Sequence, residues 1–150
     1  MYNKKLVEEF WSTFGKYMSL QPGANGAKVN WINYKTGIRY VQFKLFADDK
    51  TASLTVELSN PDPGVQQMLF TQIMNDRQML ESFTNEKWIW TPSVVTGGGN
   101  IISLFSQELR EVNVYVKSDW PAIISFFKPL LTGLDLFWSE QKDFYMMIAG

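Results

Sequence analysis

Carboxylates, lysines and aromatic rings are the side chains in this sequence that could do chemistry. The 150 residues include no cysteine and no histidine, so thiol nucleophiles, Ser-His-Asp triads, imidazole acid–base catalysis and zinc sites are not expected within one chain. Any catalysis would have to use aspartate, glutamate or lysine. We favour a protein that is not an enzyme and that carries no cofactor, and the alternative is a metal-dependent nuclease.

Glu57 is the carboxylate best placed for a metal-dependent reaction. It lies in an alternating segment, 52–58, and the predicted order of the first elements, α-βββ-α-β, resembles the core of the PD-(D/E)XK nucleases. That resemblance implies a divalent metal held by carboxylates of adjacent strands, with a lysine nearby. Here Ser59 stands where the motif has lysine, and Asp48 and Asp49 lie in a turn. The match is incomplete, so Mg²⁺ is expected only under the nuclease interpretation.

A structural role for Glu57 is the favoured alternative. Lys44 and Arg39 lie in the segment predicted to form the neighbouring strand. Opposite charges at facing positions of antiparallel strands attract each other. We therefore expect Glu57 to pair with Lys44 or Arg39.

The polar segment around residues 33–37 is a candidate anion-binding turn. Tyr34, Lys35 and Arg39 would present an aromatic ring and two cations to a phosphate or a nucleic-acid backbone. Lys28 and Lys44 could extend these cations into a strip on one face of the sheet. Because the spacing is weakly specific, a simple solvated turn is the favoured interpretation.

Six tryptophans suggest either a large aromatic core or a binding surface. Trp88 and Trp90 alternate in a predicted strand, so they share one face, and Ile89 points the other way. If that face is uncovered, it exposes aromatic rings, which are typical of a protein interface. Homodimerisation through Trp88 and Trp90 is the resulting hypothesis.

The elements that must position these residues alternate between helical and strand periodicity. Helices are predicted over 6–18 and 65–83, and a third begins at the capping pair Ser118-Asp119 and is kinked at Pro129. Strands are predicted over 28–33, 37–47, 52–58, 87–92, 101–107 and 113–116. The resulting order, α-βββ-α-βββ-α, predicts an α+β fold with antiparallel sheet or sheets packed by three helices.

Composition favours one globular domain spanning residues 1–150. The 14 basic and 15 acidic residues give a net charge of −1, and no basic run marks a nucleic-acid binder. Neither a signal-peptide pattern nor an apolar run of bilayer length is evident. We expect a cytoplasmic protein without a membrane partner.

Six segments resemble a bacterial family of unknown function, DUF4268: 31–39, 52–58, 88–90, 119–121, 126–129 and 134–138. None of them is a catalytic signature. The resemblance implies a prokaryotic, cytoplasmic protein, and members of this family often lie C-terminal to nuclease-like regions.

The sequence as a whole predicts a non-enzymatic interaction module with a protein partner or with itself. The alternative is a degenerate nuclease-like domain that binds DNA through Lys35, Arg39 and Lys44. A third hypothesis is the binding of a small ligand against the aromatic rings.

Overall fold

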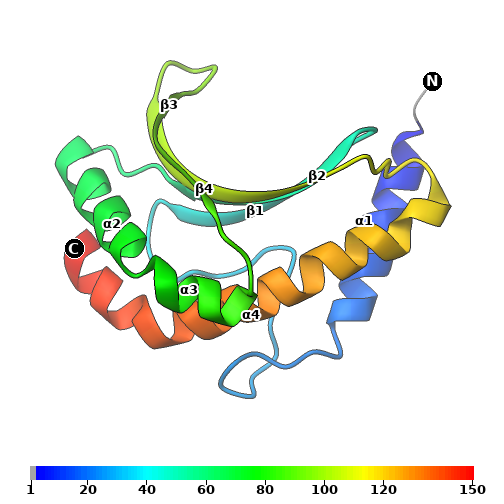
Figure 1. The fold of residues 1–150 in the computed structure, drawn as a ribbon, viewed down its shortest axis with the longest axis horizontal. Coiled ribbons are helices and arrows are strands. Elements are labelled where there is room, and N and C mark those ends of the chain that lie inside the picture. The colour runs from blue at the N-terminus through cyan, green and yellow to red at the C-terminus, as the bar shows by residue number, and fades with distance from the viewer. Residues whose placement is uncertain (1–2) are drawn as a thin grey trace.

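The computed structural model describes residues 3–150, which form a helical layer packed on one four-stranded antiparallel sheet. The elements are α1 (Lys4–Met18), β1 (Val41–Ala47), β2 (Thr51–Leu58), α2 (Pro63–Asn75), α3 (Arg77–Thr84), β3 (Ile89–Val95), β4 (Ile101–Arg110), the short 3₁₀ helix η1 (Lys117–Asp119) and α4 (Trp120–Ala149). The strand order is β1-β2-β4-β3. Figure 1 shows the helices on the convex side of the curved sheet, with the concave side open. The predicted α+β class with an antiparallel sheet is confirmed.

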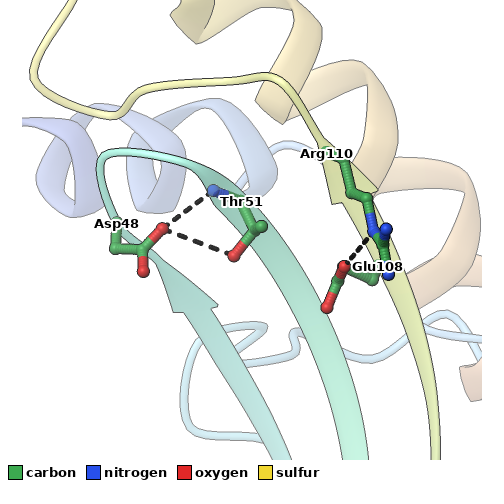
Figure 2. Close-up of polar contacts among 4 residues, drawn as sticks. All are labelled: Asp48, Thr51, Glu108 and Arg110. Atoms are coloured by element: carbon green, nitrogen blue, oxygen red, sulfur yellow. Dashed lines mark hydrogen bonds and ion pairs between the residues drawn. The ribbon is translucent and has the colours of Figure 1, made fainter.

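The β1–β2 hairpin confirms the alternating pattern and its acidic turn. Along β2 every second residue is buried, from Ala52 to Leu58, which places one face on the core. The Asp48 carboxylate closes the turn by accepting the backbone N–H of Lys50 at 2.9 Å and the backbone N–H of Thr51 at 2.8 Å. Figure 2 shows the contact with Thr51. These two backbone hydrogen bonds are the main reason that the pKa of Asp48 lies below its usual range.

The β3–β4 hairpin confirms the predicted strand over 101–107, which extends to Arg110. Gly99, with φ of +83°, lies in the tip that joins the two strands. A register shift between Thr91 and Val94 interrupts the pairing of β3 with β4. Strand β3 lies at an edge of the sheet.

The strand predicted over 28–33 and the hairpin turn at 33–37 are wrong. Residues 19–40 form an irregular segment, and β1 begins only at Val41. Local side-chain hydrogen bonds compete with strand pairing here. The Thr36 hydroxyl bonds the carbonyl groups of Ile38 and Val41, at 3.1 and 2.9 Å. Two strands rather than three thus precede α2, and the PD-(D/E)XK-like order is not confirmed.

The strand predicted over 113–116 is wrong as well. Asn113 forms a local turn, since its side chain accepts the Tyr115 N–H at 2.8 Å. Its own N–H donates at 2.9 Å to Asp119, whose carboxylate makes no capping bond to α4. Asp119 is the residue that precedes the helix, as predicted, but its side chain fixes the preceding loop.

The single helix predicted over 65–83 is divided into α2 and α3 at Asp76. The backbone there departs from the helix, with φ of −90° and ψ of 10°. The Asp76 carboxylate accepts hydrogen bonds from Tyr145 and Gln141 of α4 and from Gln72 of α2. The break therefore lets an acidic side chain, placed between α2 and α3, bond to both α2 and α4.

Helix α4 is the central core helix. It has 30 residues, contains Pro129 without ending there, and buries eleven residues, including Phe127, Leu134 and Trp138. Its length and hydropathy would also suit a membrane span, but half of its most apolar window is buried inside the protein. The core helix of a soluble protein passes the same test of length and hydropathy.

Candidate binding cleft

A cleft lies between residues 19–40 and α4. It has a volume of about 710 Å³. We call it the loop–helix cleft. Its walls are formed by Gly15, Ser19, Ala24, Asn25, Ala27, Lys28, Val29, Asn30, Trp31, Ile32, Tyr34, Lys35, Asp135, Trp138, Ser139, Lys142 and Asp143.

Asp135 anchors the irregular segment to α4. Its side chain is buried, and burying a carboxylate is costly unless it is hydrogen-bonded. One oxygen accepts the Ala24 N–H at 2.7 Å, and the other accepts the Tyr34 hydroxyl at 2.5 Å. In a third hydrogen bond between α4 and this segment, the Trp138 Nε1–H donates at 2.8 Å to the Thr36 carbonyl. One wall of the cleft is thus held at three points.

Tyr34 acts as a neutral hydrogen-bond donor in this wall. Burial raises its pKa far above the ordinary range, and the hydrogen bond to Asp135 and that residue's negative charge raise it further. A phenol that resists ionisation is neither an activated nucleophile nor a base. Its part in the cleft is structural.

The aromatic rings of the cleft have their polar atoms occupied within the protein. The Trp31 Nε1–H donates at 3.0 Å to the Gln21 carbonyl, and the ring is almost fully buried. The Tyr34 ring stacks on Phe43, with centroids 4.6 Å apart. Together with Trp138, these rings give the cleft an apolar floor.

Three lysines line the cleft around this floor. Lys28 and Lys35 are exposed, and Lys142 is half-buried. Among residues 3–150, the ion pairs formed involve none of the three. Their ammonium groups are therefore available to an added anion.

The position of Lys142 depends on a glycine. Gly37 has φ of +76°, and a Cβ atom placed there would lie 2.6 Å from Lys142 Nζ. Real Cβ contacts are not this short, so the missing side chain lets the lysine lie against the backbone at Gly37. The positive φ independently favours glycine.

The structure brings together only part of the predicted basic strip. Tyr34, Lys35 and Lys28 line the cleft. Arg39 instead lies over the Tyr40 ring, with its Cζ 4.9 Å from the ring centroid, outside the cleft walls. The strip of four aligned cations is therefore wrong.

Glu57 forms the ion pair expected for a structural role. Lys44 Nζ lies 3.1 Å from Glu57 Oε1 across facing strands, on the side of the sheet opposite the core. The lysine side chain is half-exposed, so the pair contributes little to stability. Within the described chain, no group of three or more Asp or Glu side chains is arranged to hold a metal ion.

Trp88 and Trp90 share one face, but that face is the core. Trp88 is only 5% exposed, and its Nε1–H donates to the Thr84 hydroxyl at 3.1 Å. The Trp90 ring stacks on Phe105 with centroids 4.5 Å apart. The expected exposed aromatic patch is wrong, because the helical layer covers this face.

Sequence reasoning missed the residues that α4 contributes to the cleft. Asp135 lies between Leu134 and Leu136 in a strongly apolar stretch, and an acidic residue there is a signal of a buried polar contact. Lys142 and Ser139 carry no such signal. Their place in the cleft depends on how residues 19–40 cross the helix.

A second cleft, of about 610 Å³, lies beside the β1–β2 turn and is more open. Its wall residues Glu108 and Arg110 form an ion pair at 2.7 Å (Figure 2). Because these charges are already paired and the cleft is more open, the loop–helix cleft is the stronger candidate.

The sequence matches one family model. No curated protein and no solved structure matches the chain. The family model described as a domain of unknown function, DUF4268, matches residues 6–142, a span that includes every element from β1 to η1 and most of α1 and α4. The chain belongs to the DUF4268 family.

Proposed function

We propose that this chain is a non-enzymatic binding module that holds its ligand in the loop–helix cleft. The observation that carries the proposal is a cleft of about 710 Å³ with an aromatic floor and three lysines outside any ion pair of residues 3–150. Clefts that bind small molecules have volumes of roughly 300–1,000 Å³ and combine apolar walls with a few polar groups.

The chemistry of the cleft supports binding rather than catalysis. Asp135 already accepts two hydrogen bonds that fix the wall. The raised pKa of Tyr34 makes its hydroxyl a poorer acid at neutral pH. The side chains that remain to meet a ligand are cations, and these attract and orient it.

DNA binding by Lys35, Arg39 and Lys44 has less support. Lys44 is paired with Glu57, and Arg39 lies outside the cleft that Lys35 lines. A duplex needs several cations along one surface to hold its phosphates. Self-association through Trp88 and Trp90 loses support for a different reason, because helices cover that face.

A fragment screen with two matched variants tests the proposal. Ligand-observed NMR would identify fragments that bind, and ¹⁵N–¹H spectra would locate them. Ser139→Trp fills the mouth of the cleft from an exposed position of α4, whereas Ser12→Trp adds the same ring to an exposed position of α1 outside the cleft.

We expect the bound fragments to shift cleft residues and to be lost in Ser139→Trp but retained in Ser12→Trp. Fragments that cluster elsewhere on the surface, or that bind Ser139→Trp as well as the unmodified chain, would contradict the proposed site. Salt-sensitive binding of duplex DNA that is retained in Ser139→Trp would favour the nuclease-like alternative.

A further inference from the structure

We infer that the loop–helix cleft is built for a small organic anion, whose apolar body lies on the aromatic floor and whose acidic group is held by Lys142 with Lys35 and Lys28. This inference rests on the proposed function and specifies the ligand class. Three features of the cleft support it: its charge, the placement of Lys142 and the chemistry of its floor.

The charge of the cleft differs in sign from that of the whole chain. Three lysines and two aspartates line it, which gives +1, whereas the chain has a net charge of −1. One of the two acids, Asp135, is buried and already bonded to the Ala24 N–H and the Tyr34 hydroxyl. The other, Asp143, is exposed. An anion that enters the cleft therefore meets the three ammonium groups with little competition from these acids. The Asp135 carboxylate is already hydrogen-bonded, and the Asp143 carboxylate is solvated.

Lys142 is the best placed of the three cations. It comes from the rigid helix α4, it is half-buried, and its ammonium end lies against Gly37. Partial burial removes water from a charged group, which strengthens its attraction to an opposite charge. Because α4 also carries Asp135 and Trp138, the backbone at Lys142 and the anchored wall keep a fixed relation.

The floor favours an apolar ligand body. The Nε1–H groups of Trp31 and Trp138 donate to protein carbonyls, so neither is free to bond a polar ligand. The ligand body is therefore recognised by shape and apolar contact, and the anionic group supplies the polar recognition. Phosphate and carboxylate both satisfy this requirement.

Two pairs of probes separate the contribution of charge from that of the body. Adenosine 5′-monophosphate is compared with adenosine, and 1-naphthoate with 1-naphthamide. Affinity is measured by titration of ¹⁵N–¹H shifts of cleft residues, at low salt and at high salt. The variants are Lys142→Gln, which retains most of the side-chain length, and Lys87→Gln, which removes an exposed lysine from outside the cleft.

We expect at least one anion to bind about tenfold more tightly than its neutral partner. That preference should fall to near unity in Lys142→Gln, should be retained in Lys87→Gln, and should decrease at high salt. The two pairs also decide between a phosphate and a carboxylate. Unchanged thermal unfolding of Lys142→Gln would show that the loss is not caused by misfolding.

The outcomes test the anion inference and the proposed binding module separately. Equal binding of anions and neutral partners in the cleft would overturn the anion inference and leave the binding module intact. The absence of saturable shifts with either anion at millimolar concentration would also overturn it. Saturable shifts that lie only outside the cleft, and that Ser139→Trp does not alter, would overturn both.

Discussion

Two tyrosine–aspartate pairs join α4 to other parts of the chain, and they do so with the roles reversed. At one end of the helical layer, α4 provides the tyrosine, and the Tyr145 hydroxyl donates at 2.7 Å to Asp76 between α2 and α3. In the cleft, α4 provides the aspartate, and Tyr34 of the irregular segment donates to Asp135 at 2.5 Å. Burial is the largest cause of the raised pKa of both tyrosines.

The surroundings of the two pairs differ more than their hydrogen bonds. Asp76 also accepts from Gln72 and Gln141, so every nearby donor belongs to a packed helix. Asp135 accepts from a tyrosine and a backbone N–H of one irregular segment, and a cleft lies beside it. The same bond therefore holds helices together in one place and shapes a binding surface in the other.

The largest expected effect is on the helix junction. Asp76→Ala leaves the buried Tyr145 hydroxyl and two amide side chains without their acceptor, and we expect a loss of about 3 kcal/mol in the free energy of unfolding. Urea unfolding followed by tryptophan fluorescence measures it. Asp143→Ala, at an exposed position of α4, is the control, and a similar loss in both variants would contradict the assigned role of Asp76.

A smaller and more local effect is expected at the cleft. Asp135→Ala leaves the Ala24 N–H and the Tyr34 hydroxyl unpaired and should cost about 2 kcal/mol. Hydrogen exchange should increase over residues 24–34 and leave β2 and β4 unchanged. Asp135→Asn should recover part of the protection. Its side-chain carbonyl can accept the Ala24 N–H, and its side-chain NH₂ can donate to the Tyr34 hydroxyl. Uniform loss of protection along the chain would show that the segment has no independent stability.

Alkaline pH should weaken both pairs. The folded state holds the tyrosine protons more tightly than the unfolded state, so this stability is present below the ordinary tyrosine pKa of about 10 and is lost as the pH rises above it. Each tyrosine should contribute a slope of at most about 1.4 kcal/mol per pH unit. Replacing Tyr34 and Tyr145 together by Phe should flatten the decline measured by urea unfolding from pH 9 to about pH 11. Tyr17→Phe, at an exposed tyrosine, is the control.

The smallest effect separates backbone strain from the lysine contact. Gly37→Ala and Gly26→Ala both place alanine at a positive φ, of +76° and +80°, which should cost each variant about 1 kcal/mol. Only Gly37 lies against Lys142, whereas a Cβ at Gly26 would meet nothing within 4 Å. Anion binding should therefore weaken in Gly37→Ala alone. Equal binding by the two variants would contradict the role of Gly37 in placing the lysine.

Periodicity predicted the elements whose side chains alternate between core and solvent. The strands that contain Leu54 and Phe105 and the helices that contain Phe14 and Phe127 follow directly from the spacing of apolar residues. The failures occur where a polar side chain forms hydrogen bonds that the spacing of apolar residues does not record. Thr36 and Asn113 bond nearby backbone groups, and Asp76 turns out of a helical pattern toward α4.

Local composition could predict only some of the residues of the candidate site. Tyr34 and Lys35 were identified from their local composition, but Lys142 enters the cleft through a contact between residues more than 100 positions apart. Asp135 could have been recognised as an acid in an apolar stretch, although its partners could not. Long-range contacts of this kind leave no trace in local spacing.

The edges of the sheet have a consequence for how the protein behaves in concentrated solution. In β3 the shift in register falls at Pro92, which has no N–H to offer an approaching strand. At the other edge, β1 carries Lys44 at its centre, and a charge there disfavours pairing with a second copy. We therefore expect both edges to disfavour extension of the sheet from one molecule to the next, the strand pairing on which fibrillar aggregation depends.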